Sequence, residues 1–411
     1  MKNMTKLSLC LMIVFFASCD EVNTVEKNAD NKIDQYDEDY LKVVEPNNSV
    51  AFSLLEKVDP DENNNVLISP TSALIALFIA YNGAEGETKE EIEKALQLHD
   101  VSMEDVNKAN AALMKTLTKD MDAIELFLAN SIWLNDNYQF MGTFTEKVLD
   151  DYDAKIAEID ITDDSSVERI NQWVSDNTHG KIEEIVEAPL HSAMVTLFVN
   201  ALYFNGKWTH EFDEEYTEEQ TFFTLEADKI IPFMQLEAKL AYMENDLFQA
   251  IQLPYGKGEM HMNVLLPLEN IDLEDISEEL SAESWEDWQT QFEKMDGTLK
   301  LPKFQIEYET VLNEAFQQLG IQTAFDKDRA DFPHIIVEEE PLWIHEIKQK
   351  TFIDVNEKGT EGAAATSVEM ETTSAMLDDT FYMEVNRPFL FTITDEETGA
   401  ILFIGKISNP E

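Results

Sequence analysis

Apolar residues recur along this chain with two different spacings, one typical of helices and one typical of strands. Helical spacing of apolar residues predicts helices at 51–58, 89–98, 167–177 and 312–319. Continuous or alternating apolar runs predict strands at 65–68, 124–134, 194–204, 260–266, 381–385, 388–394 and 400–407. Helices and strands are mixed without strict alternation, and no internal repeat is present. The pattern therefore predicts an α+β fold rather than a doubly wound sheet.

Three of these elements carry more detailed expectations. The run 194–204 is nearly continuously apolar, as expected of a central strand covered on both faces. Ser69 and Pro70 predict the N-cap and first residue of a helix that is apolar on every side and ends at Gly83. The last two strands, joined by a turn at Thr398-Gly399, predict a hairpin.

One segment near the C-terminus combines two tendencies. Residues 357–366 are mostly Gly, Ala, Thr and Glu, which is typical of a flexible segment. Directly afterwards Val368, Met370 and Thr372 alternate with Glu369, Glu371 and Thr373, which is typical of a strand with one buried face. The segment is therefore predicted to change between a loop and a strand.

The N-terminus predicts export and lipidation. Lys2 and Lys6 precede an apolar run at 7–16 that is too short for a stable membrane anchor, and Ala17-Ser18-Cys19 resembles a bacterial lipobox. That resemblance implies a signal peptide over 1–18, acylation of Cys19, a flexible acidic tether over 19–46 and a folded domain over 47–411. The expected location is the cell envelope, with the protein anchored to the outer membrane or the cell surface. The alternative is an ordinary secretory signal with an incidental cysteine.

Charge narrows the possible partners. The chain has 83 Asp and Glu against 29 Lys and Arg, a formal net charge of −54. Removing the two signal-peptide lysines leaves 27 basic residues, so the mature net charge is 27 − 83 = −56. Nucleic acid and heparin are therefore not expected partners. The acidity either solvates the exposed faces of helices or adapts the surface to saline or anionic surroundings, and both interpretations stay open.

The sequence carries no recognisable catalytic motif. It has no G-x-S-x-G elbow, no glycine-rich phosphate loop and no H-E-x-x-H pair, and its seven histidines form no ligand-spaced pair. Cys10 would leave with the signal peptide and Cys19 would be acylated, so no thiol remains for catalysis or disulfides. A triad assembled only in space stays open at this point. The prediction is a protein that is not an enzyme and holds neither metal nor cofactor.

Several motifs, in order along residues 46–411, resemble the serpin family. They are Asn65-Val66-Leu67-Ile68-Ser69-Pro70-Thr71-Ser72, the run 198–208, Leu301-Pro302-Lys303-Phe304, the hinge 357–366, Arg387-Pro388-Phe389-Leu390-Phe391 and Gly405-Lys406-Ile407-Ser408-Asn409-Pro410. The resemblance implies a monomer with three β-sheets, eight or nine α-helices and an exposed reactive-centre loop at about 357–380. It also implies that a target protease cuts the loop, forms an acyl-enzyme and is trapped when the loop inserts into the main sheet.

The resemblance assigns further roles by position. It implies a hinge comprising Glu357, Gly359, Thr360, Glu361, Gly362, Ala363, Ala364, Ala365 and Thr366. On insertion the side chains of Thr360, Gly362, Ala364, Thr366, Val368 and Met370 would face the core, and those of Glu361, Ala363, Ala365, Ser367, Glu369 and Glu371 would face water. A shutter behind the middle of the sheet would contain Ser69, Ser72, Asn200 and Gln349. Many serpins have His where this chain has Gln349, which cannot titrate. A breach, where the loop first enters the sheet, would contain Trp208, and Lys303 paired with Glu357.

The family spacing places the scissile bond between Thr373 and Ser374. The longer segment that follows leaves Ala375, Met376 and Leu377 as alternatives. No Lys or Arg occurs between Lys358 and Arg387, which argues against trypsin-like targets. The expected function is suicide inhibition of serine endopeptidases, and possible cysteine endopeptidases, of elastase-like or subtilisin-like specificity. The alternative is a non-inhibitory serpin that acts as a binding or chaperone-like module.

Overall fold

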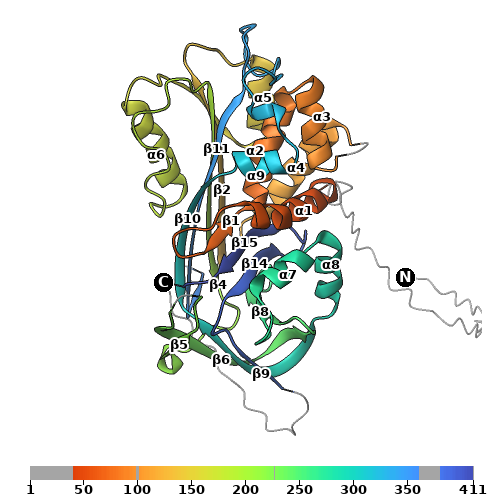
Figure 1. Cartoon of the computed structure of the whole chain (residues 1–411), viewed down its shortest axis with the longest axis vertical. Helices are drawn as coiled ribbons and strands as arrows, with labels where there is room; N and C mark the ends of the chain where they lie inside the picture. Colours follow the sequence, from red (N-terminus) through yellow and green to blue (C-terminus); the bar gives the residue numbers. More distant parts are fainter. Residues whose placement is uncertain (1–39, 99–100, 226, 361–379, 411) are drawn as a thin grey trace, which may run out of the picture. The chain divides into compact units, whose positions relative to one another are not determined.

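The computed structural model describes residues 40–98, 101–225, 227–360 and 380–410, all within one compact unit, Tyr36–Glu411. The described residues form nine α-helices and fifteen strands, which agrees with the expected α+β class (Figure 1). The helices are α1 (Leu41–Lys57), α2 (Pro70–Gly83), α3 (Gly86–Ala95), α4 (Met103–Leu117), α5 (Gly142–Tyr152), α6 (Ser165–Asn177), α7 (Leu273–Glu279), α8 (Ala282–Thr290) and α9 (Asn313–Gln318). The strands are β1 (Val66–Ile68), β2 (Ile124–Asn135), β3 (Lys155–Ile159), β4 (Thr196–Lys207), β5 (Glu218–Phe222), β6 (Lys229–Glu244), β7 (Phe248–Tyr255), β8 (Met260–Pro267), β9 (Glu293–Pro302), β10 (Phe304–Val311), β11 (Ile344–Asn356), β12 (Gly359–Thr360), β13 (Phe381–Glu384), β14 (Phe389–Asp395) and β15 (Ile401–Ile407).

The strands form one larger and one smaller hydrogen-bonded sheet among the described residues. The larger sheet runs β1-β15-β14-β8-β7-β6-β9-β13, with β5 also paired to β6. Only the last four residues of β6, 241–244, pair with β7, whereas 229–242 pair with β5 and β9. Two of the three expected sheets are thus joined through one end of β6, and the expected hairpin is the antiparallel pair β14–β15.

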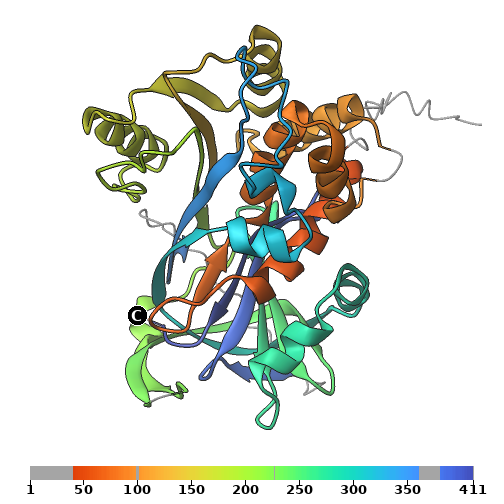
Figure 2. The same cartoon turned by 45° about the horizontal axis from the view of Figure 1, so that its top comes forward.

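The smaller sheet has the order β10-β11-β12-β4-β2-β3 and is covered on both faces. Apolar residues of α6 pack on one face against Trp133, Leu197 and Val199, while α2 packs on the other face with Phe198 and Leu202. Figures 1 and 2 show α6 and α2 on opposite sides of these strands. This double cover explains why β4 is buried at nearly every position.

Helix α2 forms as its N-terminal residues predict. The Ser69 side chain accepts a hydrogen bond from the Ser72 backbone N–H at 3.2 Å, and Pro70 is the first helical residue. Every residue of α2 is buried, as expected for a helix that is apolar on all sides. The N-cap therefore fixes Ser69 directly behind the smaller sheet.

The boundary between tether and folded domain, placed after residue 46, was wrong. Helix α1 begins at Leu41, and Val43 and Val44 are buried in the core. The many acidic residues before α1 masked the helical signal of Val43 and Val44. Proline usually ends or kinks a helix, but α1 continues through Pro46. Tertiary burial of the first turn therefore extends the folded domain toward the N-terminus.

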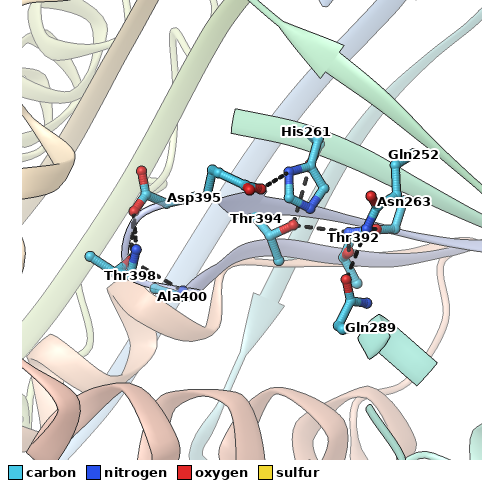
Figure 3. A network of polar contacts seen from close by, with 10 residues as sticks. Gln252, His261, Asn263, Gln289, Thr392, Thr394, Asp395, Thr398 and Ala400 are labelled. Atoms are coloured by element: carbon cyan, nitrogen blue, oxygen red, sulfur yellow. Dashed lines mark hydrogen bonds and ion pairs between the residues drawn. The ribbon is translucent and has the colours of Figure 1, made fainter. Parts of the chain in front are cut away.

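A buried polar network holds the C-terminal hairpin against β8 (Figure 3). The Asn263 side-chain amide donates to the hydroxyls of Thr392 and Thr394, each at 2.9 Å. At the turn after β14, Asp395 accepts from the backbone N–H and the hydroxyl of Thr398, at 2.8 and 2.7 Å. These hydrogen bonds stabilise the larger sheet.

Candidate functional site

The candidate site is an opening between the two central strands of the smaller sheet. Strands β4 and β11 pair in parallel from Thr196 and Ile344 as far as Leu202 and Thr351. Beyond that point the two strands separate, and the two-residue strand β12 lies between them, antiparallel to both. Three residues of each strand, 203–205 and 352–354, lie between the last direct pair and β12. The sheet is therefore open at one end and already holds the first residues of another strand.

Gly359 is required here by close backbone approach. Its backbone has φ +155°, and a Cβ added to it would lie 2.0 Å from the Gly206 carbonyl oxygen and 2.8 Å from Lys207 Cα. Those neighbours are backbone atoms of β4, so they cannot move aside as a flexible side chain could. Glycine at this position is thus explained by the fit of β12 against β4, in addition to conformational freedom.

The side chain of Thr360 is fully buried and hydrogen-bonded. Its hydroxyl lies 2.6 Å from the hydroxyl of Tyr255, and the Tyr255 ring stacks on Trp208 with centroids 4.3 Å apart. Trp208 in turn donates from Nε1 to the Asn356 carbonyl oxygen at 2.9 Å. Burial raises the pKa of Tyr255 well above its ordinary value, so this hydroxyl stays protonated. Thr360 thus faces the core, as its place in the alternating pattern predicts.

An ion pair fixes the residue at the base of the hinge. Glu357 accepts from Lys303 Nζ at 2.8 Å and from the Thr217 hydroxyl at 2.8 Å, and its side chain is only 8% exposed. Burial alone would raise the pKa of Glu357, but the hydrogen bonds from Lys303 and Thr217 outweigh it and hold the pKa below its ordinary value. The backbone carbonyls of Glu357 and Lys358 also accept from Phe212 N and Trp208 N.

The shutter residues lie together behind the middle of the sheet. The Gln349 side chain makes two hydrogen bonds to the Ser69 backbone, accepting from N–H at 2.8 Å and donating to C=O at 2.9 Å. The Asn200 amide donates to Asn130 Oδ1 at 2.7 Å, and the Ser72 hydroxyl donates to the same oxygen at 3.2 Å. An amide thus bonds β11 to the start of α2, and another bonds β4 to β2.

Strand β11 pairs with β10 on one side and with β4 on the other, and the two pairings differ in their ion pairs. On the β10 side, Lys350 pairs with Glu307 at 2.6 Å and Lys348 pairs with Glu309 at 2.6 Å. These ion pairs reinforce the ladder that joins β10 and β11 over the whole length of β10. No ion pair between described residues joins β4 to β11. The β10–β11 ladder thus has ion pairs on its surface that the β4–β11 seam lacks.

Sequence reasoning located part of this site and missed part of it. Ser69, Ser72, Asn200, Gln349, Trp208, Lys303 and the hinge residues Glu357, Gly359 and Thr360 lie around the β4–β11 seam. It missed Tyr255, Thr217 and Asn130. The amide of Asn130, between the apolar residues 126–129 and 132–134, was a usable signal, whereas no local pattern marks the other two. The remaining hinge residues, the Thr373–Ser374 bond with its alternatives up to Leu377, and Cys19 lie outside the described residues.

No described helix combines the length and apolar character needed to cross a bilayer. Nowhere in 40–98, 101–225, 227–360 or 380–410 do three or more His, Cys, Asp or Glu side chains gather as metal ligands would.

Comparisons with known proteins agree with this geometry. A family model described as serpin (serine protease inhibitor) matches residues 45–410. Human Serpin B8 is 32% identical over 375 residues, which cover 89% of this chain and 99% of the human protein. The crystal structure of Tengpin, a thermophilic serpin in its native state, superposes with a TM-score of 0.82 at 33% identity and covers 90% of this chain and 94% of its own. Human thyroxine-binding globulin superposes with a TM-score of 0.82 at 25% identity and covers 90% and 99%.

Proposed function

The chain belongs to the serpin family, and from this premise we propose that it is a suicide inhibitor of serine endopeptidases. In this proposal a protease cuts the loop after β12 and forms an acyl-enzyme. The cut loop then continues β12 between β4 and β11 before the ester is hydrolysed. The observation that carries the proposal is that Gly359 and Thr360 already pair with both strands, at the point where those strands separate.

The register of β12 specifies how insertion would proceed. Gly359 is opposite Lys207 and Thr360 is opposite Gly206, so each following residue would meet the preceding residue of β4. The next three residues, 361–363, would fill the opening opposite 205–203 without breaking any β4–β11 pair. From Ala364 onward each residue would separate one existing pair, and the seven pairs of the seam would be replaced by residues 364–370.

This register divides insertion into a first stage that breaks no β4–β11 pair and a second stage that breaks them one by one. The opening accommodates three residues at no cost in existing ladder hydrogen bonds. The next seven residues replace one strand interface by two, so ladder hydrogen bonds are gained overall. The gain cannot be realised while the loop is tethered at both ends, because residues up to 370 must travel the length of the seam. The uncut form is therefore metastable, and cleavage of the loop removes the restraint.

The residues near the scissile bond restrict the choice of protease. Thr373 is small and uncharged, and no cationic side chain occurs between Lys358 and Arg387. A pocket that requires Lys or Arg would find no match there, whereas an elastase-like or subtilisin-like pocket accepts a small residue. Cleavage at Met376 or Leu377 would instead favour a chymotrypsin-like or papain-like protease. We therefore propose an elastase-like or subtilisin-like serine protease as the target class.

The test is to mix the protein with an elastase-like protease and look for a complex that survives denaturing electrophoresis. Thr360→Arg places a large charge where the Thr360 side chain is fully buried, so it should convert inhibition into plain cleavage of the loop. Val311→Arg, at an exposed position on the edge of the same sheet, is the matched control and should still trap the protease.

Loop cleavage without a stable complex, across several protease classes, would instead support the non-inhibitory alternative. Human thyroxine-binding globulin, by its name a protein that binds thyroxine, has the same fold, so the fold alone does not decide between the two. The small residues and alternating polarity of the hinge favour inhibition, because a binding module has no need of an insertable loop.

The location proposed for this activity is the cell envelope. Support comes from the lipobox-like Ala17-Ser18-Cys19 at the end of a short apolar run. Acylation of Cys19 would anchor the inhibitor to the outer membrane or the cell surface, and the residues up to the start of α1 would act as the tether. A monomer fits the mechanism, since one loop inserts into its own sheet.

A further inference from the structure

Two histidines meet at the end of the β4–β11 seam that lies opposite the opening. His191 belongs to the segment that leads into β4, and His345 is the second residue of β11. Their ring centroids are 4.8 Å apart and the rings are inclined by 31°. His191 is exposed to solvent and His345 is half-buried. The sequence separation of 154 residues explains why no spacing pattern identifies this pair.

The pair spans the first contacts between the two strands. Thr196 and Ile344 form the first register pair of the seam, and the ladder is irregular between Ile344 and Glu346, where His345 lies. The Thr196 hydroxyl donates to the Trp343 carbonyl oxygen at 3.0 Å, which is a second connection at the same end. Any strand that fills the whole seam must separate these groups.

We propose that His191 and His345 form a proton-sensitive clasp that holds this end of the β4–β11 seam together at neutral pH and releases it in mild acid. Two neutral imidazoles can remain in contact at a tilt of 31°, whereas two imidazolium ions at this separation repel each other. Existence of the clasp does not depend on the proposed inhibition, but its consequence for loop insertion rests on that function.

A hydrogen bond to the main chain holds the His191 ring in place. Its Nδ1 accepts from the Ala193 backbone N–H at 3.2 Å, and a ring nitrogen that accepts a hydrogen bond carries no proton. This bond fixes the ring against the segment that leads into β4.

The surroundings of His345 also favour its neutral form, because they lower its pKa. Burial is the main cause that lowers its pKa, and the neighbouring His191 lowers it further, while Glu346 opposes them. Helix α9 also contacts β11 here, through the neutral Asn313, whose amide donates to the His345 carbonyl oxygen at 2.8 Å. A site with a lowered pKa in the closed state binds protons better when open, so the open state gains as the pH falls below about 6.5.

The clasp would make the sheet sensitive to pH at the Thr196–Ile344 end of the seam rather than at its centre. In the shutter, Gln349 cannot titrate, so the middle of the seam is insensitive to pH over the physiological range. The His pair would act at the end of the same seam, where the last inserted residues arrive. Mild acid should accelerate completion of insertion.

Hydrogen exchange tests the clasp without requiring a protease. Exchange of the backbone amides in 194–202 and 344–351 is measured at pH 7.5 and pH 5.0 and corrected for the intrinsic dependence of exchange on pH. We expect about tenfold weaker protection at pH 5.0, from the repulsion of two like charges whose ring centroids are 4.8 Å apart in the closed state. Peptides of the larger sheet serve as an internal reference.

Variants separate the histidines from the many carboxylates that also titrate. His345→Phe and His191→Phe both keep an aromatic ring in the clasp. His345→Phe removes the half-buried titrating group and should reduce the pH effect at these amides to less than twofold, whereas His191→Phe removes only the repulsion between the rings and should reduce the effect in part, because burial of His345 remains. His191 is exposed, so its variant should fold even where the half-buried site tolerates Phe poorly. His334→Phe, which alters an exposed His paired with Glu85, is the control and should retain the tenfold effect.

The outcomes distinguish the clasp from the inhibitory function. Equal protection at both pH values, or an undiminished pH effect in the His191→Phe variant, would overturn the clasp whatever the protease assay shows. A pH effect that needs both histidines, in a protein that forms no stable complex with any protease, would support the clasp and refute the inhibitory function. If both hold, the rate of complex formation should also rise in mild acid in the wild type and not in His345→Phe.

Discussion

Replacing Tyr255 by Phe tests the hydrogen bond that keeps the hinge docked. The variant removes one hydroxyl and leaves the stacked ring beside Trp208. In the docked state the buried hydroxyl of Thr360 then loses its partner at 2.6 Å. A buried hydroxyl without a partner costs about 1–3 kcal/mol, so a value of about 2 kcal/mol shifts the equilibrium toward undocked β12 by roughly 30-fold.

Hydrogen exchange of the amides in 355–360 is the assay, because Gly359 and Thr360 pair with β4 and with residues 355 and 356 of β11 only when β12 is docked. The matched control is Tyr308→Phe, which removes a hydroxyl that donates to the Asp59 carbonyl oxygen at 2.6 Å, away from the hinge. The control should destabilise the protein without selectively exposing 355–360. Exposure of these amides to the same extent in both variants would indicate general destabilisation.

A double-mutant cycle with Thr360→Val makes the reasoning refutable. Val removes the second hydroxyl, so adding Tyr255→Phe to this variant should cost much less than it does in the wild type. The expected coupling between the two changes is about 1–2 kcal/mol in the docking equilibrium. Purely additive effects would show that the 2.6 Å contact does not stabilise the docked hinge.

Three further predictions concern other parts of the molecule. Gly359→Ala should displace β12 from the sheet, because its Cβ would meet the Gly206 carbonyl oxygen; exchange of the 355–360 amides should increase, and unchanged protection would contradict the close approach. Lys303→Met should lower the melting temperature at pH 7, and the difference from wild type should vanish as the pH falls through the lowered pKa of Glu357, below about 4.5, because the ion pair stabilises the fold only while that carboxylate is charged. Cys19→Ala should abolish labelling by fatty acid in cells, and persistent labelling would refute lipidation at this residue.

Local patterns in the sequence were sufficient for most elements around the site. The apolar run at 194–204 predicted a central strand, and β4 is indeed covered by helices on both faces. Ser69 and Pro70 predicted the start of α2, which places two shutter residues. Before Pro46 the sequence is rich in acidic residues, and this composition was read as a flexible tether. The beginning of the folded domain was therefore placed too late, at residue 47 instead of in α1.

The sequence by itself determined that residues 357–373 combine small side chains with a strand-like alternation, since both properties depend on neighbouring residues alone. Only the tertiary structure decided that β4 and β11 separate after Leu202 and Thr351, and that β12 occupies part of the space. The partnership of Tyr255 with Thr360 and the contact between His191 and His345 were also decided there. The physical reason is that register and close approach between distant strands depend on the packing of the whole sheet, which no local period encodes.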